Sequence, residues 1–284
     1  MTSPLKFTIV TPSYRQLRWL KLCAASVEDQ RDEVEVEHLI QDARSGPELA
    51  DWVRSNTHAR LFVESDSGMY DAINRGFQKA TGDIVAWLNC DEQYFPGALA
   101  QVAAFFEAHP AIDVLFGDTV LIDEAGSLLS YRRAILPTPL HLRLSHRDAL
   151  SCATFVRRSV IERGFWLNPE WKVVADAIWI ADLLRAKVRM AVLPKPLAAF
   201  TLTRENLSQT NLAREESLRW REQSTSPWMR SLRLPMIVWH RLRKLFHGAY
   251  ASRDFDTRLY TQSSNLARVS VSARNIPFSW PRLP

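Results

Sequence analysis

Two adjacent carboxylates, Asp91 and Glu92, come one residue after a short apolar stretch of the sequence, residues 83–89 (DIVAWLN). Such a pair suits a hard divalent cation that also binds substrate phosphates, because Mg²⁺ usually takes one or two protein carboxylates and leaves its other positions to water and phosphate oxygens. The alternative is structural. A helix is expected just after Pro96, and the pair could stabilise its N-terminus. An acidic side chain in that position stabilises a helix by about 0.3–1 kcal/mol. The pair alone does not separate these interpretations.

Polar residues also follow the other strands predicted in the first half of the chain. Residues 11–14 (TPSY) come after the first strand, Asp42 after the second, Asp66 after the third, and Asn89 with the acidic pair after the fourth. In a parallel α/β sheet, ligands bind beyond the carboxyl ends of the strands, where the loops gather. One cleft that receives all four strand ends explains this pattern and favours a metal-dependent ligand site over a helix cap.

Short β-rich stretches alternate with helical patterns and predict the framework that positions these residues. Strands are predicted over residues 7–11, 36–41, 59–63, 83–89, 114–117, 153–157 and 188–193. Helices are predicted over residues 16–28, 48–55, 70–81, 97–108 and 174–186. Alternation of this kind indicates the α/β class, with a mostly parallel sheet and flanking helices. A hairpin-like insertion is expected over residues 118–133.

The composition excludes several other classes of protein. With 284 residues, 46% hydrophobic and 24% charged, the chain is typical of a soluble globular protein with a sizeable core. Cys23, Cys90 and Cys152 are far apart and form no CxxC pair, which argues against a disulfide framework and a structural zinc site and fits a reducing cytoplasm. We find no signal-peptide pattern and no apolar run near the ~18 residues of a membrane span. A cytoplasmic protein is expected.

The net charge of +5 is concentrated in residues 228–247, which hold five cations and no Asp or Glu. These cations are Arg230, Arg233, Arg241, Arg243 and Lys244. Because the rest of the chain is close to neutral, nucleic acid is not the expected partner. Residues 235–247 predict a basic amphipathic helix, which suits peripheral contact with an anionic membrane surface. The alternative is a helix that packs on the catalytic domain and leaves a basic face in solvent.

Several motifs lie in order along the first hundred residues. They are TPSY at 11–14, DSGMYDAINRG at 66–76, ATGD at 80–83 and LNCDE at 88–92, with PGA at 96–98. Together they resemble the motifs of inverting glycosyltransferases of family two, and the resemblance covers about residues 5–205. It implies a GT-A fold, a nucleotide-diphosphate sugar as donor, and inverting transfer that depends on a divalent metal, Mn²⁺ or Mg²⁺.

The resemblance also implies roles for the residues after the first three strands. Pro12 and Tyr14 would line the nucleotide pocket, Asp42 would bond the base, and Asp66 would be a donor-contacting acid. Around Asp42 the family commonly shows a glycine-rich loop, DGGSTD, whereas this chain has DARSG over residues 42–46. This difference in sequence affects the conformation of the loop that carries Asp42.

Tyr70, Asp71 and Asn74 match the family's helix after the third strand and would belong to the donor site. Asp71 and Asn74 lie one helical turn apart and share a face with Tyr70. The alternative role of Tyr70 and Asn74 is helix capping and packing.

The acidic pair and the residue two positions before it match the family's metal-binding motif. Asn89 would contact the donor, Asp91 would face the ribose or the metal, and Glu92 would be the closer metal ligand. The family usually has two aspartates where this chain has Asp91-Glu92. The longer second side chain places the metal differently or holds it less tightly.

A general base must come from elsewhere in the chain. Inverting transfer needs a carboxylate within hydrogen-bond reach of the acceptor hydroxyl, opposite the leaving diphosphate. In the family this acid begins a helix after the acceptor loop, and residues 174–179 (VADAIW) match that place, which makes Asp176 the candidate. Asp182 is the competitor, but it lies six residues later, well inside the helix. The alternative for Asp176 is an N-cap or first-turn aspartate.

The chain is expected to consist of two parts. A GT-A catalytic domain is predicted over residues 1–208 and a C-terminal extension over residues 209–284, with the basic amphipathic helix at about 228–248 and strands or an ordered tail after Arg253. The expected reaction is sugar transfer to a hydroxyl acceptor in bacterial-type polysaccharide or lipid-linked glycan synthesis. Peripheral attachment suits a lipid-linked glycan acceptor built at the cytoplasmic face.

Two other classes of function stay open. A nucleotidyltransferase uses a similar sheet and metal but attacks the α-phosphate. It is expected to carry a glycine- and lysine-rich loop after the first strand, whereas the loop here is PSYRQ over residues 12–16. The other class is a non-enzymatic module that binds a membrane surface. Fold alone does not decide between these classes.

Overall fold

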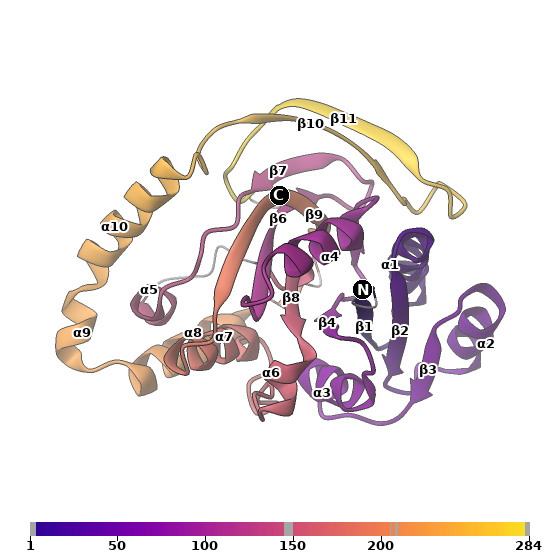
Figure 1. Ribbon diagram of the computed structural model, residues 1–284, viewed down its shortest axis with the longest axis horizontal. Coiled ribbons are helices and arrows are strands. Elements are labelled where there is room, and N and C mark those ends of the chain that lie inside the picture. The colour runs from indigo at the N-terminus through magenta and orange to yellow at the C-terminus, as the bar shows by residue number, and fades with distance from the viewer. Residues whose placement is uncertain (1–3, 145–149, 205, 208–209, 282–284) are drawn as a thin grey trace.

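A curled sheet with helices on both faces forms the body of the molecule (Figure 1). The structure, a computed structural model, describes residues 4–144, 150–204, 206–207 and 210–281. Over these residues nine strands form the sheet, in the order β3-β2-β1-β4-β8-β6-β9-β5 with β7 on β6. They are β1 (Lys6–Ser13), β2 (Glu35–Asp42), β3 (Arg60–Val63), β4 (Ile84–Trp87), β5 (Glu92–Tyr94), β6 (Val114–Ile122), β7 (Leu128–Arg132), β8 (Thr154–Arg157) and β9 (Met190–Thr201).

The predicted mostly parallel α/β sheet is confirmed. Strands β1, β2, β3, β4, β6 and β9 run in one direction, and β5, β7 and β8 run the other way. The insertion expected over residues 118–133 is the hairpin of β6 and β7, and its turn contains Gly126 with φ +90°. Because β6 continues into this hairpin, it is longer than the predicted strand.

Helices follow the strands much as predicted. They are α1 (Leu17–Glu28), α2 (Pro47–Asn56), α3 (Met69–Lys79), α4 (Ala98–Ala108), α5 (Pro139–Leu144), α6 (Arg158–Glu162) and α7 (Ala175–Arg185). Gly68 (φ +126°) and Gly97 (φ +67°) immediately precede α3 and α4, in backbone conformations that favour glycine. Helix α4 therefore begins at Ala98, and Pro96 lies in the turn before the helix rather than in its first turn.

Side chains that alternate along the central strands build a core on each face of the sheet. Ile9 packs in the cluster beneath α4, whereas Val10 belongs to the cluster shared with α3 and α7. In that second cluster, Trp87 of β4 lies edge-on to both Phe77 of α3 and Trp179 of α7, with ring centroids 6.1 and 6.0 Å apart. Such pairs contribute about 0.5–1.5 kcal/mol beyond the burial of their area. They fix α3 and α7 on the same face of the sheet.

The C-terminal extension contains α8 (Asn211–Ser224), α9 (Pro227–Ser231), α10 (Arg233–Phe246), β10 (Arg253–Leu259) and β11 (Val269–Ile276). The hairpin of β10 and β11 arches over the sheet, while α9 and α10 form the opposite edge of the molecule from α2 (Figure 1). The strands expected after Arg253 are thus present. The domain boundary near residue 208 stays a prediction, and Ser208 itself lies outside the described residues.

The tip of this hairpin is bound to the edge strand β5. The side chain of Gln93 donates to Tyr260 O at 3.1 Å and accepts from Tyr260 N at 2.9 Å. Arg268 donates to Tyr94 O at 3.0 Å and forms an ion pair with Asp29. The extension therefore supports the short strand that begins with Glu92.

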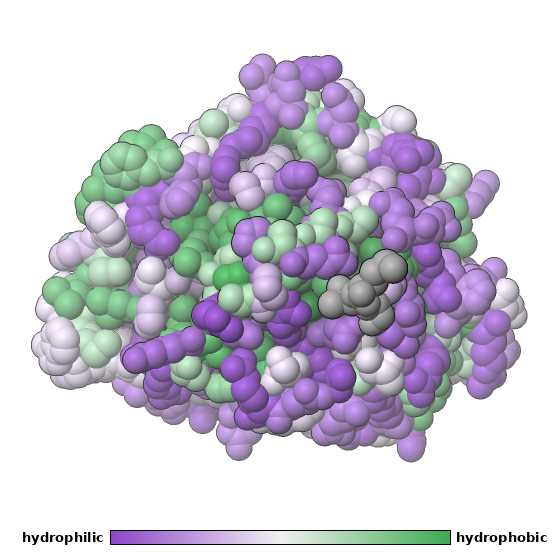
Figure 2. Space-filling model, viewed as in Figure 1, coloured by the Kyte–Doolittle hydropathy of each residue, from purple (hydrophilic) through white to green (hydrophobic). Residues whose placement is uncertain are grey.

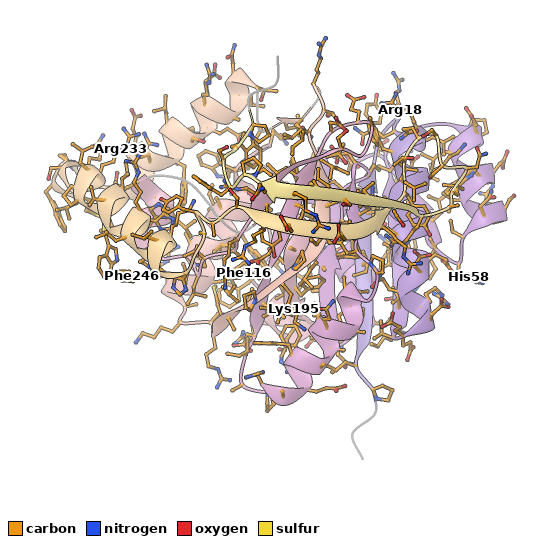
Figure 3. The ribbon with its side chains drawn as sticks, turned by 90° about the horizontal axis from the view of Figure 1, so that it is seen from above. Arg18, His58, Phe116, Lys195, Arg233 and Phe246 are labelled. Atoms are coloured by element: carbon orange, nitrogen blue, oxygen red, sulfur yellow. The ribbon has the colours of Figure 1, made fainter. Side chains whose placement is uncertain are left out.

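Helices α9 and α10 direct large apolar side chains outward. Trp228, Leu234 and Phe246 are 68%, 74% and 84% exposed, whereas His240 is the buried residue of α10 and stacks on His141 of α5 with ring centroids 3.5 Å apart. Figure 3 shows the ends of α10, and Figure 2 shows apolar surface along this edge. None of the helices in the described part of the chain is long and apolar enough to cross a bilayer.

A buried histidine between β1 and β2 predicts how stability depends on pH. Burial, with a smaller effect of the Arg31 charge, lowers the pKa of His38 from 6.5 to about 3. His38 therefore binds a proton near pH 6.5 in the unfolded chain, whereas in the folded chain it stays neutral down to about pH 3. Stability from the neutral imidazole is fully present above pH 6.5 and is lost as pH falls through 6.5 toward 3, by at most about 1.4 kcal/mol per pH unit.

We expect His38→Gln to flatten this acid slope. The measurement is the free energy of unfolding in urea between pH 7 and pH 5. Thr11→Val is the matched control, because it removes the hydroxyl that bonds His38 Nε2 at 2.9 Å but leaves the titrating group in place. Equal slopes in the wild type and His38→Gln would contradict the prediction.

Candidate active site

The carboxyl ends of β1, β2 and β4 meet at one edge of the sheet. Ser13 is in register with Asp42, and Ala43 N donates to Ser13 O at 2.8 Å. Cys90, just beyond β4, donates its Sγ–H to Pro12 O at 3.3 Å. The loops after these three strands therefore adjoin one another, and the single cleft for all four strand ends stays a prediction.

Tyr14 and Asp42 occupy this edge in different ways. Tyr14 is 56% exposed, with the guanidinium of Arg15 lying 5.1 Å from its ring centroid. Asp42 is buried, and its carboxylate accepts from Ser45 N at 2.8 Å and from Ser45 Oγ at 2.5 Å. The Tyr14 ring is accessible to a flat ligand, while Asp42 shapes the DARSG loop. Contact of Asp42 with a base stays a prediction.

Asp66 and Asp71 lie at the entrance to α3. Burial raises the pKa of Asp66; the hydrogen bond from Gly68 N opposes this, and the charges of Asp71 and Asp42 add to it. Burial also tends to raise the pKa of Asp71, but the hydrogen bonds from Ser67 N (2.9 Å) and Arg75 reverse the effect and hold it below its usual range. Asp42, Asp66 and Asp71 therefore contribute negative charge to one neighbourhood.

Tyr70 and Asn74 are largely occupied with contacts inside the protein. The buried Tyr70 donates its hydroxyl to Val173 O at 2.8 Å. Asn74 donates to Leu167 O at 2.7 Å and accepts from Leu167 N at 3.2 Å. These contacts match the packing alternative for both residues, and their contact with a donor stays a prediction. They connect α3 to the segment that leads into α7.

The acidic pair lies where β4 gives way to β5. Asp91 Oδ2 accepts from Asn206 Nδ2 at 2.9 Å, and Glu92 Oε2 accepts from Asn89 N at 2.8 Å. Glu92 is 1% exposed. Burial first, and then the charge of Asp91, raises the pKa of Glu92 to about 8, with a smaller contribution from the charge of Asp176. The carboxylates of the pair thus lie in a setting that disfavours more negative charge.

Asp176 lies in the first turn of α7, on the side of the acidic pair. It is 5% exposed, and its Oδ1 accepts from Ala177 N at 2.8 Å, so it bonds the helix start as well. Its charge reaches Glu92. The competitor Asp182 has a 45% exposed side chain that pairs with Arg185 at the surface. Asp176, and not Asp182, is therefore the buried acid of α7 whose charge affects Glu92.

The residues around the pair suit a cation that the substrate helps to hold. Within the described ranges, no group of three or more His, Cys, Asp or Glu side chains is arranged to bind a metal by itself. Asn89 Oδ1 and Glu92 Oε1 are buried oxygens that lack a hydrogen-bond partner among the described residues. Buried polar atoms are normally paired, and oxygens are the ligands that Mg²⁺ prefers, with substrate phosphates completing its shell. The oxygens present therefore fit such an ion.

Sequence reasoning missed two residues near this site. Asn206, 8% exposed, accepts from Thr203 N at 2.7 Å while donating to Asp91. Glu216, on α8, accepts backbone hydrogen bonds from the segment before Asp176. Both lie around or beyond the expected end of the catalytic domain. No local pattern marks them, because their partners are about 40 to 115 positions away in the chain.

Comparison with known protein families identifies the family of this chain. Residues 8–165 match the model described as Glycosyl transferase family 2. The chain belongs to this family. The match contains the strand ends that carry Tyr14, Asp42, Asp66, Asp91 and Glu92, and it ends before α7.

Curated relatives resemble the chain over a limited length. A "PGL/p-HBAD biosynthesis glycosyltransferase" of Mycobacterium bovis is 32% identical over 127 residues, which are 43% of this chain and 49% of that protein. An uncharacterized glycosyltransferase of Nostoc is 26% identical over 189 residues, 61% of this chain and 57% of that protein. The chain spans about half the length of the curated relatives it matches.

Solved structures share its architecture. S. aureus TarS 1-349 in complex with UDP-GlcNAc has a TM-score of 0.60 at 18% identity and covers 85% of this chain and 73% of its own. A mannosyltransferase from Pyrobaculum calidifontis in complex with GDP-Man and Mn²⁺ has a TM-score of 0.59 at 16% identity, covering 86% and 70%. At these identities the likeness concerns the fold, and it confirms the predicted GT-A type architecture.

Proposed function

We propose that this family-two chain is an inverting glycosyltransferase that moves a sugar from a nucleotide-diphosphate sugar to an acceptor hydroxyl. The observation that carries the proposal is the meeting of Asp91, Glu92 and Asp176. Asp91 lies in the loop after β4, Glu92 begins β5 and Asp176 lies in the first turn of α7, and the charges of Asp91 and Asp176 both raise the pKa of Glu92. Membership of the family argues against the nucleotidyltransferase and the purely surface-binding alternatives.

The nucleotide would bind over the loops after β1 and β2. The exposed ring of Tyr14 offers a face on which a base can stack. Pro12 lies beside it, and Asp42 and Asp66 line the adjoining loops. The two similar structures contain UDP-GlcNAc and GDP-Man, which supports a nucleotide-sugar donor of this kind.

Charge explains why a divalent cation belongs in this reaction. A nucleotide diphosphate is an anion, and Asp91, Glu92 and Asp176 would repel it. The Mn²⁺ in the mannosyltransferase complex supports a similar ion here. Asp91 would hold it, with Glu92 and Asn89 as the nearest further oxygen donors. When bound, the ion supplies Lewis-acid stabilisation of the departing diphosphate.

Asp176 would act as the general base. Inversion requires the acceptor hydroxyl to attack from the side opposite the leaving diphosphate, with a carboxylate within hydrogen-bond reach of its proton. Asp176 is held at a helix start beside the acidic pair but on a separate element, α7. This arrangement lets donor and acceptor approach from different sides.

The acceptor would be a glycan carried at an anionic membrane surface, such as a lipid-linked glycan. The apolar side chains of α9 and α10 face outward, and five cations lie between residues 230 and 244. A helix with this composition lies in the plane of a membrane, and each cation near an anionic surface contributes ~1 kcal/mol. The outward orientation does not suit a helix that packs its apolar side on the domain.

Asp91→Asn should abolish metal-dependent donor binding. We expect Mn²⁺ together with one nucleotide sugar from a panel that includes UDP-GlcNAc and GDP-Man to raise the Tm of the wild type. The stabilisation should reach about 2.7 kcal/mol at a ligand concentration of 100 Kd. The gain due to Mn²⁺ should vanish in Asp91→Asn and persist in the surface control Asp182→Asn. A gain of the same size in Asp91→Asn would overturn the metal assignment.

Asp176→Asn should stop turnover and leave donor binding nearly intact. A general base contributes about 10²–10⁴-fold to rate, so release of nucleoside diphosphate from the selected donor should fall at least about 100-fold. The Kd for the nucleotide with Mn²⁺ should stay within about twofold, and Asp182→Asn should remain active. Weakened donor affinity with residual turnover in Asp176→Asn would argue against the assignment.

Membrane attachment should depend on salt and on the apolar side of α10. We expect sedimentation with vesicles that contain phosphatidylglycerol, loss of binding as NaCl rises, and little binding to pure phosphatidylcholine. Leu234→Ser with Phe246→Ser should release the protein. Trp166→Ser, at a 40% exposed apolar residue elsewhere, is the control. Binding that ignores both salt and the α10 substitutions would rule out this mode of attachment.

A further inference from the structure

The backbone that leads into the helix of Asp176 is held by α3 from one side. We call residues 167–174 the base segment, because α7 begins directly after it at Ala175. Asn74 makes two hydrogen bonds to Leu167, and the hydroxyl of Tyr70 donates to Val173 O. Lys172 extends its Nζ to Ser67 O at 2.7 Å. The donor-side motif is therefore physically connected to the base segment.

A single carboxylate from the C-terminal extension holds the same segment from the other side. Glu216 of α8 accepts from three consecutive backbone N–H groups. These are Lys172 N at 2.7 Å and Val173 N at 2.8 Å, with Val174 N at 3.2 Å. Val174 is the N-cap of α7. Three hydrogen bonds to one side chain therefore hold the backbone just before Asp176.

The burial of Glu216 shows that this contact is a specific one. Glu216 is 7% exposed, and a carboxylate at that depth needs charged or hydrogen-bonding partners. The cation of Lys172 is directed to Ser67 O and Pro169 O, and Glu216 accepts from backbone N–H groups. Hydrogen bonds to an ionised acceptor are shorter and stronger than neutral ones. The neighbouring Glu215 is exposed.

We propose that Glu216 is a positioning residue for Asp176, so that the extension forms part of the catalytic machinery. The inference rests on the proposed role of Asp176 as general base. Without Glu216, three N–H groups at the start of α7 lose their acceptor and the base segment relaxes. A displacement of about 1 Å at a reacting group is enough to cost about 100-fold in rate. Donor binding uses the loops after β1 to β4 and should be spared.

The test compares Glu216→Ala, the isosteric Glu216→Gln and the control Glu215→Gln in the full-length chain. The readouts are release of nucleoside diphosphate from the donor selected in the thermal-shift panel, and the Kd of UDP or GDP with Mn²⁺. We expect kcat to fall ten- to hundredfold in Glu216→Ala and less in Glu216→Gln, with nucleotide Kd within about twofold. Amides 172–178 should exchange faster with deuterium in both variants and not in Glu215→Gln.

A double variant separates positioning from general destabilisation. If Glu216 acts through Asp176, then Glu216→Ala should cause no further loss of rate in the Asp176→Asn background, because residues that act as a unit are not additive. A further tenfold loss in that background, or equal weakening of nucleotide binding, would overturn the inference. If Glu216→Ala does not fold, Glu216→Gln carries the same comparison.

The outcomes also distinguish this inference from the proposed function. Wild-type activity that requires Asp176, together with unchanged kcat in both Glu216 variants, would reject the positioning role alone. A wild type that neither binds the nucleotide sugars nor turns them over would reject the proposed function itself.

Discussion

Negative charge gathered at the carboxyl edge of the sheet is the constraint on which this structure depends. Asp91, Glu92 and Asp176 come from three elements, and their proximity, together with burial, raises the pKa of Glu92 to about 8. Such a cluster is unfavourable unless surrounding groups hold it and a cation offsets it. The fold supplies many of the holding groups as neutral donors, from Asn206, Asn89 N and the backbone at the start of α7. A cluster of carboxylates that is held rigidly in this way is prepared to bind a cation and, with it, a diphosphate.

The support for this cluster comes largely from the C-terminal extension. Its hairpin binds β5 through Tyr260 and Arg268, directly beside Glu92, and α8 binds the base segment through Glu216. The family match ends at residue 165, before either contact partner. In this chain the matched part of the sheet carries the residues proposed for the donor side, and segments outside the family match hold the backbone before the carboxylate proposed as the base. We therefore regard the extension as a working part of the site and not as an appendage.

Much of the fold could be predicted from the sequence because it depends on local patterns. Strand-helix alternation located the central strands, and polar residues at strand ends located Asp42, Asp66 and Asp91. Contacts between distant segments left no such pattern. Tyr70 and Asn74 match a family motif, yet they form hydrogen bonds to Val173 and Leu167, about a hundred residues later. Glu216 lies in the polar and charged stretch after residue 208, whereas no motif includes Asn206. Helical periodicity likewise gave the amphipathic character of α10 but not its orientation, because either side of such a helix can face the protein.

That orientation connects the site to the surface on which the acceptor would be presented. Glu216 and Trp228 are separated by 12 residues, and α8 leads through α9 into α10. At about 1.5 Å per helical residue and about 3.5 Å per residue of the extended link over residues 225–226, Trp228 of α9 lies within about 25 Å of chain from the carboxylate that holds the base segment. The stacked pair of His141 and His240 fixes α10 against α5 as well. A lipid surface that engages the outward side chains of α9 and α10 would therefore bear on an element rigidly connected to Asp176. This connection would give a physical reason for building the support of the proposed base from the same extension that carries the proposed membrane-binding helices.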